Sequence, residues 1–127
     1  MVCLDTDFVI ELIRREKSAL SKLDDIVDEN ICITVITLAE LYKGAYLSSD
    51  IEAEIQKIKK MMGIVELLLL EDKAAKIFGD LFAQLRSNRI DDADLLIASV
   101  VIAENQKLLT RNLKHFERVP GLTVDTW

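Results

Sequence analysis

The stretch Met1-Val2-Cys3-Leu4-Asp5-Thr6-Asp7 decides the fold, because it predicts a buried strand that leads directly into a helix. The apolar run Val2–Leu4 stops at a carboxylate, and an amphipathic segment follows it. Short apolar runs are typical of strands in a parallel sheet, and a strand followed by a helix is the first half of a βαβ unit. Ligands of open α/β sheets bind beyond the carboxyl ends of the strands. Asp5 is therefore expected at such a crevice, unless it or Thr6 only caps the first helix.

Short apolar runs and helical patterns alternate along the rest of the chain. This alternation predicts an α/β fold, a three-layer α/β/α sandwich with a central, mainly parallel sheet of four to five strands. We expect one domain over residues 1–127. Glu66 places the third strand near an edge, and Ser49-Asp50-Ile51-Glu52 fits a capping box with Ser49 as the N-cap. The expected strands are 2–4, 31–33, a part of 64–70, 107–109 and 122–124, and the expected helices begin near residues 6, 18, 35, 50, 72 and 92, the fifth ending near residue 89.

The composition limits the function classes. The net charge of −6 argues against a protein that coats nucleic acid, although not against an enzyme that meets it through a cation and a local basic rim. Cys3 and Cys32 lie in apolar runs and are expected as buried thiols in a reducing compartment. A single histidine makes a zinc site improbable. No segment is apolar over the length of a bilayer span, so we expect a cytoplasmic protein without a membrane partner.

Acidic residues gather at two further places. Asp91, Asp92 and Asp94 precede the almost wholly apolar segment 95–103, which is typical of a buried helix. Three carboxylates exceed what capping requires, because they repel one another unless a cation or solvent separates them. Glu40 lies in the helix after the second strand, where the simpler interpretation is a surface pair with Lys43.

Asp5, Glu40 and Asp94 could converge at the carboxyl edge of one sheet. Carboxylate oxygens without histidine or thiolate companions select Mg²⁺ or Mn²⁺. One or two such ions beside a phosphodiester activate water and stabilise the leaving oxygen. The residues therefore favour metal-dependent phosphodiester hydrolysis.

The ordered set of these segments resembles the PIN-domain ribonucleases, and most closely the VapC-type toxins of toxin–antitoxin pairs. The resemblance covers nearly the whole chain, and the matching segments are Leu4-Asp5-Thr6-Asp7, Thr37-Leu38-Ala39-Glu40-Leu41, residues 90–98, Thr110-Arg111-Asn112 and residues 116–122. It implies a PIN-like sandwich and an RNA endonuclease that works with one or two Mg²⁺ or Mn²⁺ ions. It also implies a homodimer, and inhibition by a small VapB-type antitoxin whose C-terminal segment covers the active site. The apolar stripes of the helices around residues 42–62 are candidates for both contacts.

The resemblance also assigns roles to residues. Asp5, Glu40 and Asp94 are implied to be the catalytic acids that hold the metal, with Asp92 as a further ligand. Thr6, Thr110 and Asn112 are implied to support them. PIN domains often carry a fourth acid where Asn112 stands, and some relatives carry aspartate where His115 stands. We expect His115 to be an exposed histidine without a role, with general-base action as the alternative. The expected basic rim for RNA comprises Arg14, Arg15, Lys43, Arg86, Arg89 and Arg111.

Two other functions fit parts of the sequence. Asp5-Thr6-Asp7-Phe8-Val9 matches the first motif of haloacid-dehalogenase-like phosphatases, in which Asp5 would be the nucleophile and Asp7 an acid–base. That interpretation leaves Glu40 and Thr110 without a role. The non-enzymatic alternative is a PIN-like binding module that has lost activity.

Overall fold

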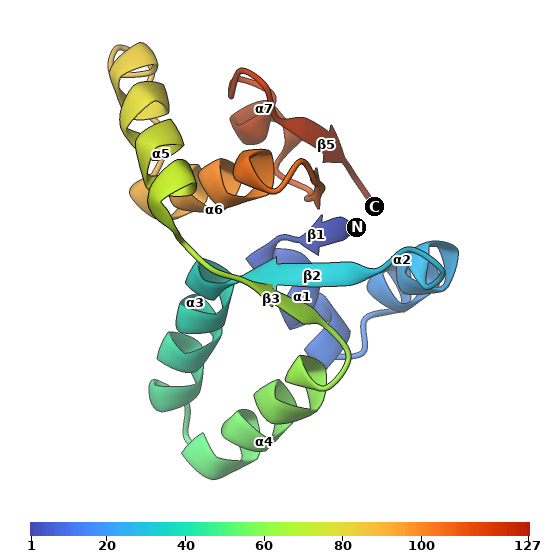
Figure 1. The fold of residues 1–127 in the computed structure, drawn as a ribbon. Helices are drawn as coiled ribbons and strands as arrows, with labels where there is room; N and C mark the ends of the chain where they lie inside the picture. The colour runs from blue at the N-terminus through green and yellow to red at the C-terminus, as the bar shows by residue number, and fades with distance from the viewer.

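The computed structural model describes residues 1–127 and contains five strands and seven helices (Figure 1). The strands all run in parallel in one sheet. In chain order the elements are β1 (Val2–Leu4), α1 (Thr6–Ile13), α2 (Lys17–Ile26), β2 (Ile31–Thr34), α3 (Val35–Tyr46), α4 (Ile51–Met62), β3 (Glu66–Leu68), α5 (Asp72–Gln84), α6 (Asp92–Ala103), β4 (Lys107–Leu109), α7 (Leu113–Phe116) and β5 (Thr123–Asp125).

The strand order β3-β2-β1-β4-β5 places β1 at the centre of the sheet and β3 at an edge, as Glu66 predicted. The chain moves from β1 outward through β2 to β3, and then returns to the other side of β1 with β4. The strand order therefore reverses between β1 and β4. Ligands of open α/β sheets bind at such a reversal, beyond the carboxyl ends of the two strands.

Alternate residues of the strands face two apolar layers. Cys3 and Leu108 belong to the cluster under α5 and α6, whereas Val2, Leu4 and Leu109 belong to the cluster under α1, α3 and α4. Figure 1 shows the two groups of helices on opposite faces of the sheet. The predicted α/β/α sandwich is thus confirmed, with a sheet that is wholly rather than mainly parallel.

The cap predicted at Ser49 lies one residue further along. Asp50 is the N-cap of α4, and its carboxylate accepts a hydrogen bond from the Ala53 N–H at 3.2 Å. Both residue types cap helices well, and a carboxylate also favours the positive end of the helix dipole. Ser49 is exposed.

The helix predicted to reach residue 89 ends at Gln84. Ser87 and Asn88 follow, and side chains of this kind compete for backbone hydrogen bonds and disfavour helix interiors. Asn88 instead accepts hydrogen bonds from Arg118 through its carbonyl and its side chain. The loop between α5 and α6 is therefore tied to the segment after α7. The last strand also lies one residue later than predicted.

Cys3 and Cys32 are free, fully buried and opposite each other on β1 and β2, as expected of small apolar residues. None of the helices has the length and apolar character that crossing a membrane would require.

Candidate active site

Asp5 lies at the reversal of the strand order, directly after β1. Its backbone N–H bonds to the Leu109 carbonyl of β4 at 3.0 Å. Its Oδ1 accepts the Thr6 N–H at 2.9 Å, and its Oδ2 accepts the Thr110 hydroxyl at 2.7 Å. Asp5 is thus the N-cap of α1, as one interpretation of the sequence predicted. It is also a buried carboxylate fixed across the boundary of two strands, as the other predicted.

Glu40 reaches this region from α3 through a pair of threonines. The Thr6 hydroxyl lies 2.6 Å from Glu40 Oε1 and 3.0 Å from Thr37 Oγ1. One hydroxyl has one proton, and an ionised carboxylate only accepts, so Thr6 donates to Glu40 and Thr37 donates to Thr6. The Glu40–Lys43 surface pair considered from the sequence is absent among the ion pairs.

Asp94 lies in the first turn of α6 and is half-buried. Its Oδ2 is 3.0 Å from Nε2 of His115, on α7. The expectation that His115 would be exposed is wrong, because its side chain is only 23% exposed. The turn after β4 brings α7 back over the N-terminus of α6, and this return could not be read from the spacing of residues.

Asp5 and Asp94 both have raised pKa values. The pKa of Asp5 rises from 3.8 to about 6, mainly through desolvation by burial and also through the charges of Asp94 and Asp7, against the lowering effect of the hydrogen bonds that it accepts from Thr110 and Thr6. The pKa of Asp94 is also raised to about 6. Burial is the largest cause, and repulsion from Asp91, Glu40 and Asp7 adds to it. The charge of Asp94 thus acts on Asp5, and the charge of Glu40 acts on Asp94, which indicates that the three predicted acids lie near one another.

The donor set fits a hard divalent cation. All the acids offer carboxylate oxygens, which Mg²⁺ and Mn²⁺ prefer, and a cation would relieve the repulsion that raises their pKa values. The side chains are nevertheless not arranged as a finished ligand set, since no three acidic, histidine or cysteine residues have the spacing of one. Each acid instead contacts its own partner, Thr110 for Asp5, Thr6 for Glu40 and His115 for Asp94.

The side chains of two predicted site residues, Asp92 and Asn112, make no hydrogen bond or ion pair with the three acids. Asp92 is exposed and is absent from the charges that raise the pKa values of Asp5 and Asp94, whereas Asp7 acts on both. Asn112 is exposed, and only its backbone takes part, as the N–H that donates to Thr110 Oγ1 at 3.0 Å.

Three residues near the acids were missed or undervalued from the sequence, namely Thr37, His115 and Arg118. The position of Thr37 three residues before Glu40 was the available signal, because residues at that spacing share a helix face.

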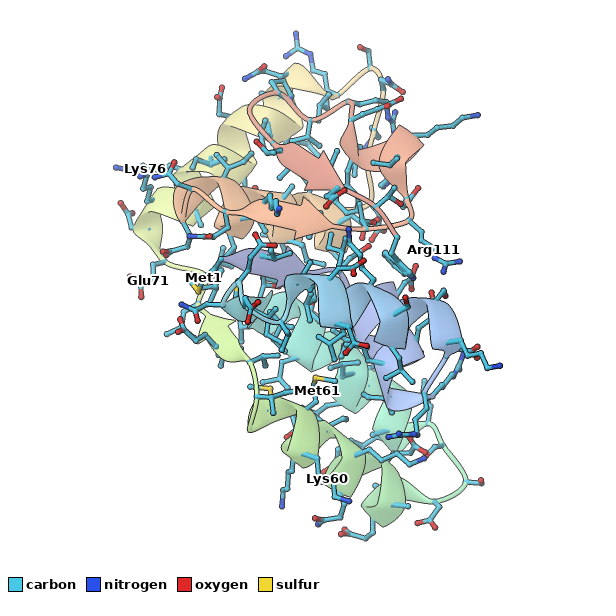
Figure 2. The ribbon with its side chains drawn as sticks, turned by 90° about the vertical axis from the view of Figure 1, so that its right-hand side faces the viewer. Met1, Lys60, Met61, Glu71, Lys76 and Arg111 are labelled. Atoms are coloured by element: carbon cyan, nitrogen blue, oxygen red, sulfur yellow. The ribbon has the colours of Figure 1, made fainter.

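Some residues of the predicted basic rim form no ion pair, and others make contacts within the fold. Arg14, Lys43 and Arg86 are exposed and form no ion pair. Arg111 lies at the surface (Figure 2), where its guanidinium is 2.7 Å from Ser18 Oγ, 3.4 Å from Glu11 Oε1 and 4.8 Å from the centre of the Trp127 ring. Arg89 packs over the Phe82 ring at 5.1 Å. The positive charges of Arg111 and Arg89 are thus partly occupied within the fold.

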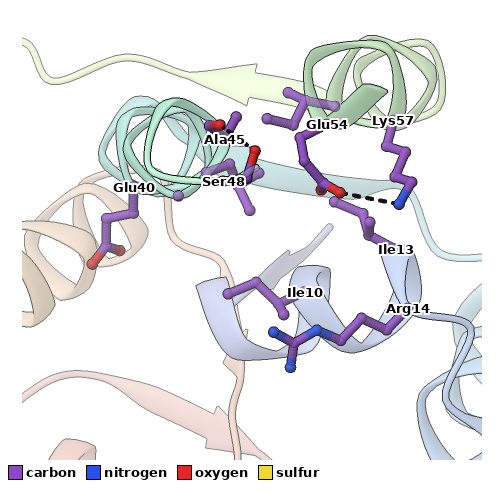
Figure 3. A pocket seen from close by; sticks show the side chains of 11 residues that line it. Ile10, Ile13, Arg14, Glu40, Ala45, Ser48, Glu54 and Lys57 are labelled. Atoms are coloured by element: carbon purple, nitrogen blue, oxygen red, sulfur yellow. Dashed lines mark hydrogen bonds and ion pairs between the residues drawn. The ribbon is translucent and has the colours of Figure 1, made fainter. Parts of the chain in front are cut away.

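A groove of about 430 Å³ begins beside Glu40 and runs between α1, α3 and α4. Figure 3 shows Glu40 at one end of it and the ion pair between Glu54 and Lys57 at the other. Its walls are mixed, with Arg14 and Ser48 among apolar residues. The adjacent end of α3 exposes Tyr46 and Leu47, which are 63% and 79% exposed. The groove is a surface open to a partner and continuous with the acidic region.

Residues 2–122 match the PIN domain family. The chain is 32% identical to ribonuclease VapC2 of Rickettsia felis over 128 residues, which covers 98% of this chain and 96% of that protein. It is 28% identical to the tRNA(fMet)-specific endonuclease VapC of Salmonella typhimurium, again over 98% and 96% of the two chains.

Solved structures show the same fold. One chain of the VapBC2 complex of Rickettsia felis, bound to a promoter DNA fragment, superimposes with a TM-score of 0.92 at 32% identity, covering 100% of this chain and 99% of that one. The VapBC-1 structure from Haemophilus influenzae gives a TM-score of 0.90 at 27% identity, with 100% and 98% covered.

Proposed function

The chain belongs to the PIN domain family, and from this premise we propose that it is a VapC-type ribonuclease, the toxin of a toxin–antitoxin pair. The observation that carries the proposal is the position of Asp5 at the reversal of the strand order, where the charge of Asp94 acts on Asp5 and the charge of Glu40 acts on Asp94. We propose these three as the catalytic acids. The substrate is RNA, and the bond broken is a phosphodiester.

Asp5, Glu40 and Asp94 would hold one or two Mg²⁺ or Mn²⁺ ions. A bound ion of this kind supplies a Lewis acid that stabilises the negative charge developing at the scissile phosphate. Thr110 holds Oδ2 of Asp5 and Thr6 holds Oε1 of Glu40, so one oxygen of each of these two acids is fixed within the fold. Asp92 and Asn112 are at best outer contributors, because their side chains are exposed and unengaged.

Exposed cations position the RNA. Arg14, Lys43 and Arg86 are free of ion pairs and are the residues that we propose to contact phosphates. Such contacts orient a strand without reading its sequence. With a net charge of −6, the chain as a whole repels RNA, and binding depends on these local cations and on the metal.

The partner we propose is an antitoxin of the VapB type. Support comes from the structural relatives, which are VapBC complexes, and from the open groove that begins at Glu40. A segment seated there would lie next to the acids and exclude RNA. We propose a homodimer on the family relationship, and sedimentation of the purified protein tests it.

The match to the PIN domain family over residues 2–122 argues against the phosphatase alternative. Its proposed acid–base, Asp7, is exposed on α1. It is not proposed further.

The decisive experiment compares Asp5→Asn and Asp94→Asn with Asp24→Asn, an exposed aspartate of α2. The first two should lower RNA cleavage by about 100-fold or more, because catalytic acids contribute on that scale. The control should cut like the wild type, and circular dichroism should show all of them folded. Full activity in either site variant contradicts the proposal. A wild-type protein that never cuts RNA would favour the inactive binding module.

A further inference from the structure

His115 presents one ring nitrogen to the acidic region. Its Nε2 lies 3.0 Å from Asp94 Oδ2, and this nitrogen is buried and makes no well-aligned hydrogen bond with any atom. A small rotation of the carboxylate at this distance would align the pair. The ring also packs edge-on against Phe116 at 5.6 Å between centroids, which restricts how it can turn.

The other ring nitrogen fixes which atom carries the hydrogen. Arg118 Nη2 lies 3.3 Å from His115 Nδ1. A guanidinium only donates, so Nδ1 must accept and the hydrogen of the neutral ring must be on Nε2. Arg118 is itself held by Asn88, through the carbonyl at 3.2 Å and through the side-chain oxygen. The loop before α6 thus holds Arg118, Arg118 orients His115, and His115 faces Asp94.

We infer that His115, oriented by Arg118, is a positioning residue that donates its Nε2–H to Asp94 and so presents Asp94 to the metal; the inference rests on the nuclease function proposed above. Asp94 Oδ2 is held by the ring, whereas Oδ1 has no hydrogen bond or ion pair within the chain. Oδ1 is therefore the oxygen of Asp94 that would be free to bind a cation. Partners of this kind change metal affinity by about 10- to 100-fold when they are removed.

Two other roles for His115 give different results. As a metal ligand it would use the Nε2 lone pair, and this requires the hydrogen on Nδ1, against the donor at Arg118. As a competitor for Asp94, His115 would weaken metal binding, so that its removal would strengthen it.

The first test reads the metal-free protein. His115 is the only histidine, so ¹⁵N–¹H correlation spectra of its ring are unambiguous. We expect the neutral ring to carry its hydrogen on Nε2. A hydrogen on Nδ1 would overturn the inference.

The second test measures Mn²⁺ binding by calorimetry. His115→Ala should bind Mn²⁺ about 10- to 100-fold more weakly than the wild type. His115→Gln, whose amide can supply an N–H near the same place, should keep most of the affinity. Lys114→Ala, an exposed cation of the same helix, should bind like the wild type. Unchanged or tighter binding by His115→Ala overturns the inference, as does equal weakening in the Ala and Gln variants.

A double variant that includes Arg118 and spectra of bound Mn²⁺ are the last two tests. Because Arg118 acts through His115, the double variant His115→Ala/Arg118→Met should bind Mn²⁺ no more weakly than His115→Ala alone. Additive losses contradict this chain of contacts. Coupling of a ring ¹⁴N to bound Mn²⁺ in electron spin echo spectra would make His115 a ligand and refute the positioning role. None of these measurements uses RNA, so a failure of the nuclease function is recognised separately, by the Asp5→Asn comparison.

Discussion

The Thr6 hydroxyl on α1 donates a hydrogen bond of 2.6 Å to Glu40 on α3, joining residues 34 positions apart at the acidic site. Thr6 also provides the backbone N–H that holds Asp5. One residue therefore fixes two of the three acids, one through its backbone and the other through its side chain.

Replacing only the side-chain contact separates these contributions. Thr6→Val keeps the backbone N–H and the volume but removes the donor to Glu40. We expect RNA cleavage to fall by about 10- to 100-fold, as for other partners of metal-binding carboxylates. Thr6→Ser, which restores the hydroxyl, should remain close to the wild type. Equal rates for the Val and Ser variants would show that the contact is unimportant for cleavage.

The raised pKa values make the metal-free protein less stable as the pH rises. Asp5 and Asp94 have pKa values of about 6 in the folded chain, against 3.8 as the ordinary value. Between these pH values the folded state binds more protons than the unfolded state, so the free energy of unfolding falls as the pH rises from about 4 to about 6. For Asp5 the loss is about 1–3 kcal/mol.

Urea unfolding in EDTA at pH 4.5 and pH 7 measures this loss. Asp5→Asn removes one titrating group and should flatten the dependence, whereas Asp24→Asn should keep the wild-type slope. Comparison with the wild type is essential because Asp125, whose pKa is lowered by the Thr126 N–H, contributes with the opposite sign. An unchanged slope in Asp5→Asn contradicts the prediction.

Removing divalent cations should stop RNA cleavage, and Mg²⁺ or Mn²⁺ should restore it. Binding to the folded state alone also raises stability, by about 2.7 kcal/mol at a concentration of 100 times Kd. Thermal unfolding with and without Mn²⁺ measures this gain, which should be lost in Asp94→Asn. Cleavage that persists in EDTA would rule out the metal-dependent mechanism.

Arg14 and Lys43 should affect only RNA affinity, whereas Arg111 should also affect the stability of the fold. Arg14→Gln and Lys43→Gln should each weaken RNA binding and lower the slope of log K against log salt by about 0.7, as expected for one lost phosphate contact on a single strand. Arg111→Gln should also lower the melting temperature, because it breaks contacts with Glu11 and Trp127. Fluorescence anisotropy in the Asp94→Asn background measures binding without cleavage. Slopes equal to that of the parent would remove Arg14 and Lys43 from the RNA surface.

Two glycines offer a matched test of the groove. Gly44 of α3 lines the groove and Gly79 lies on α5, and a Cβ added at either would meet no atom within 4 Å. Gly44→Phe should therefore fold but block a segment seated in the groove, reducing binding of the VapB-type antitoxin proposed above as the partner. Gly79→Phe should leave that binding unchanged. Titration calorimetry with the purified antitoxin distinguishes them, and equal affinities would place the antitoxin elsewhere.

The alternation of strands and helices was predictable from the sequence, because the apolar period and the cap residues are local properties. Val2–Leu4 was predicted to its ends, and α3 was predicted to begin near residue 35, where the structure has its first residue. The end of α5 was not predicted, although Ser87 and Asn88 disfavour a helix locally, and the contact that Asn88 makes instead comes from Arg118, 30 residues further along. Local propensity contains no information about a partner at that distance.

Residue type and position near the ends of elements predicted Asp5, Glu40 and Asp94 as the acids of the site. The contacts of each acid came only from the packed structure: Thr110 for Asp5, Thr6 and Thr37 for Glu40, and His115 for Asp94. The physical reason is that a strand order is read from hydrophobic patterns, whereas a hydrogen bond depends on ångström-scale distances between side chains, and these arise only when the layers pack together.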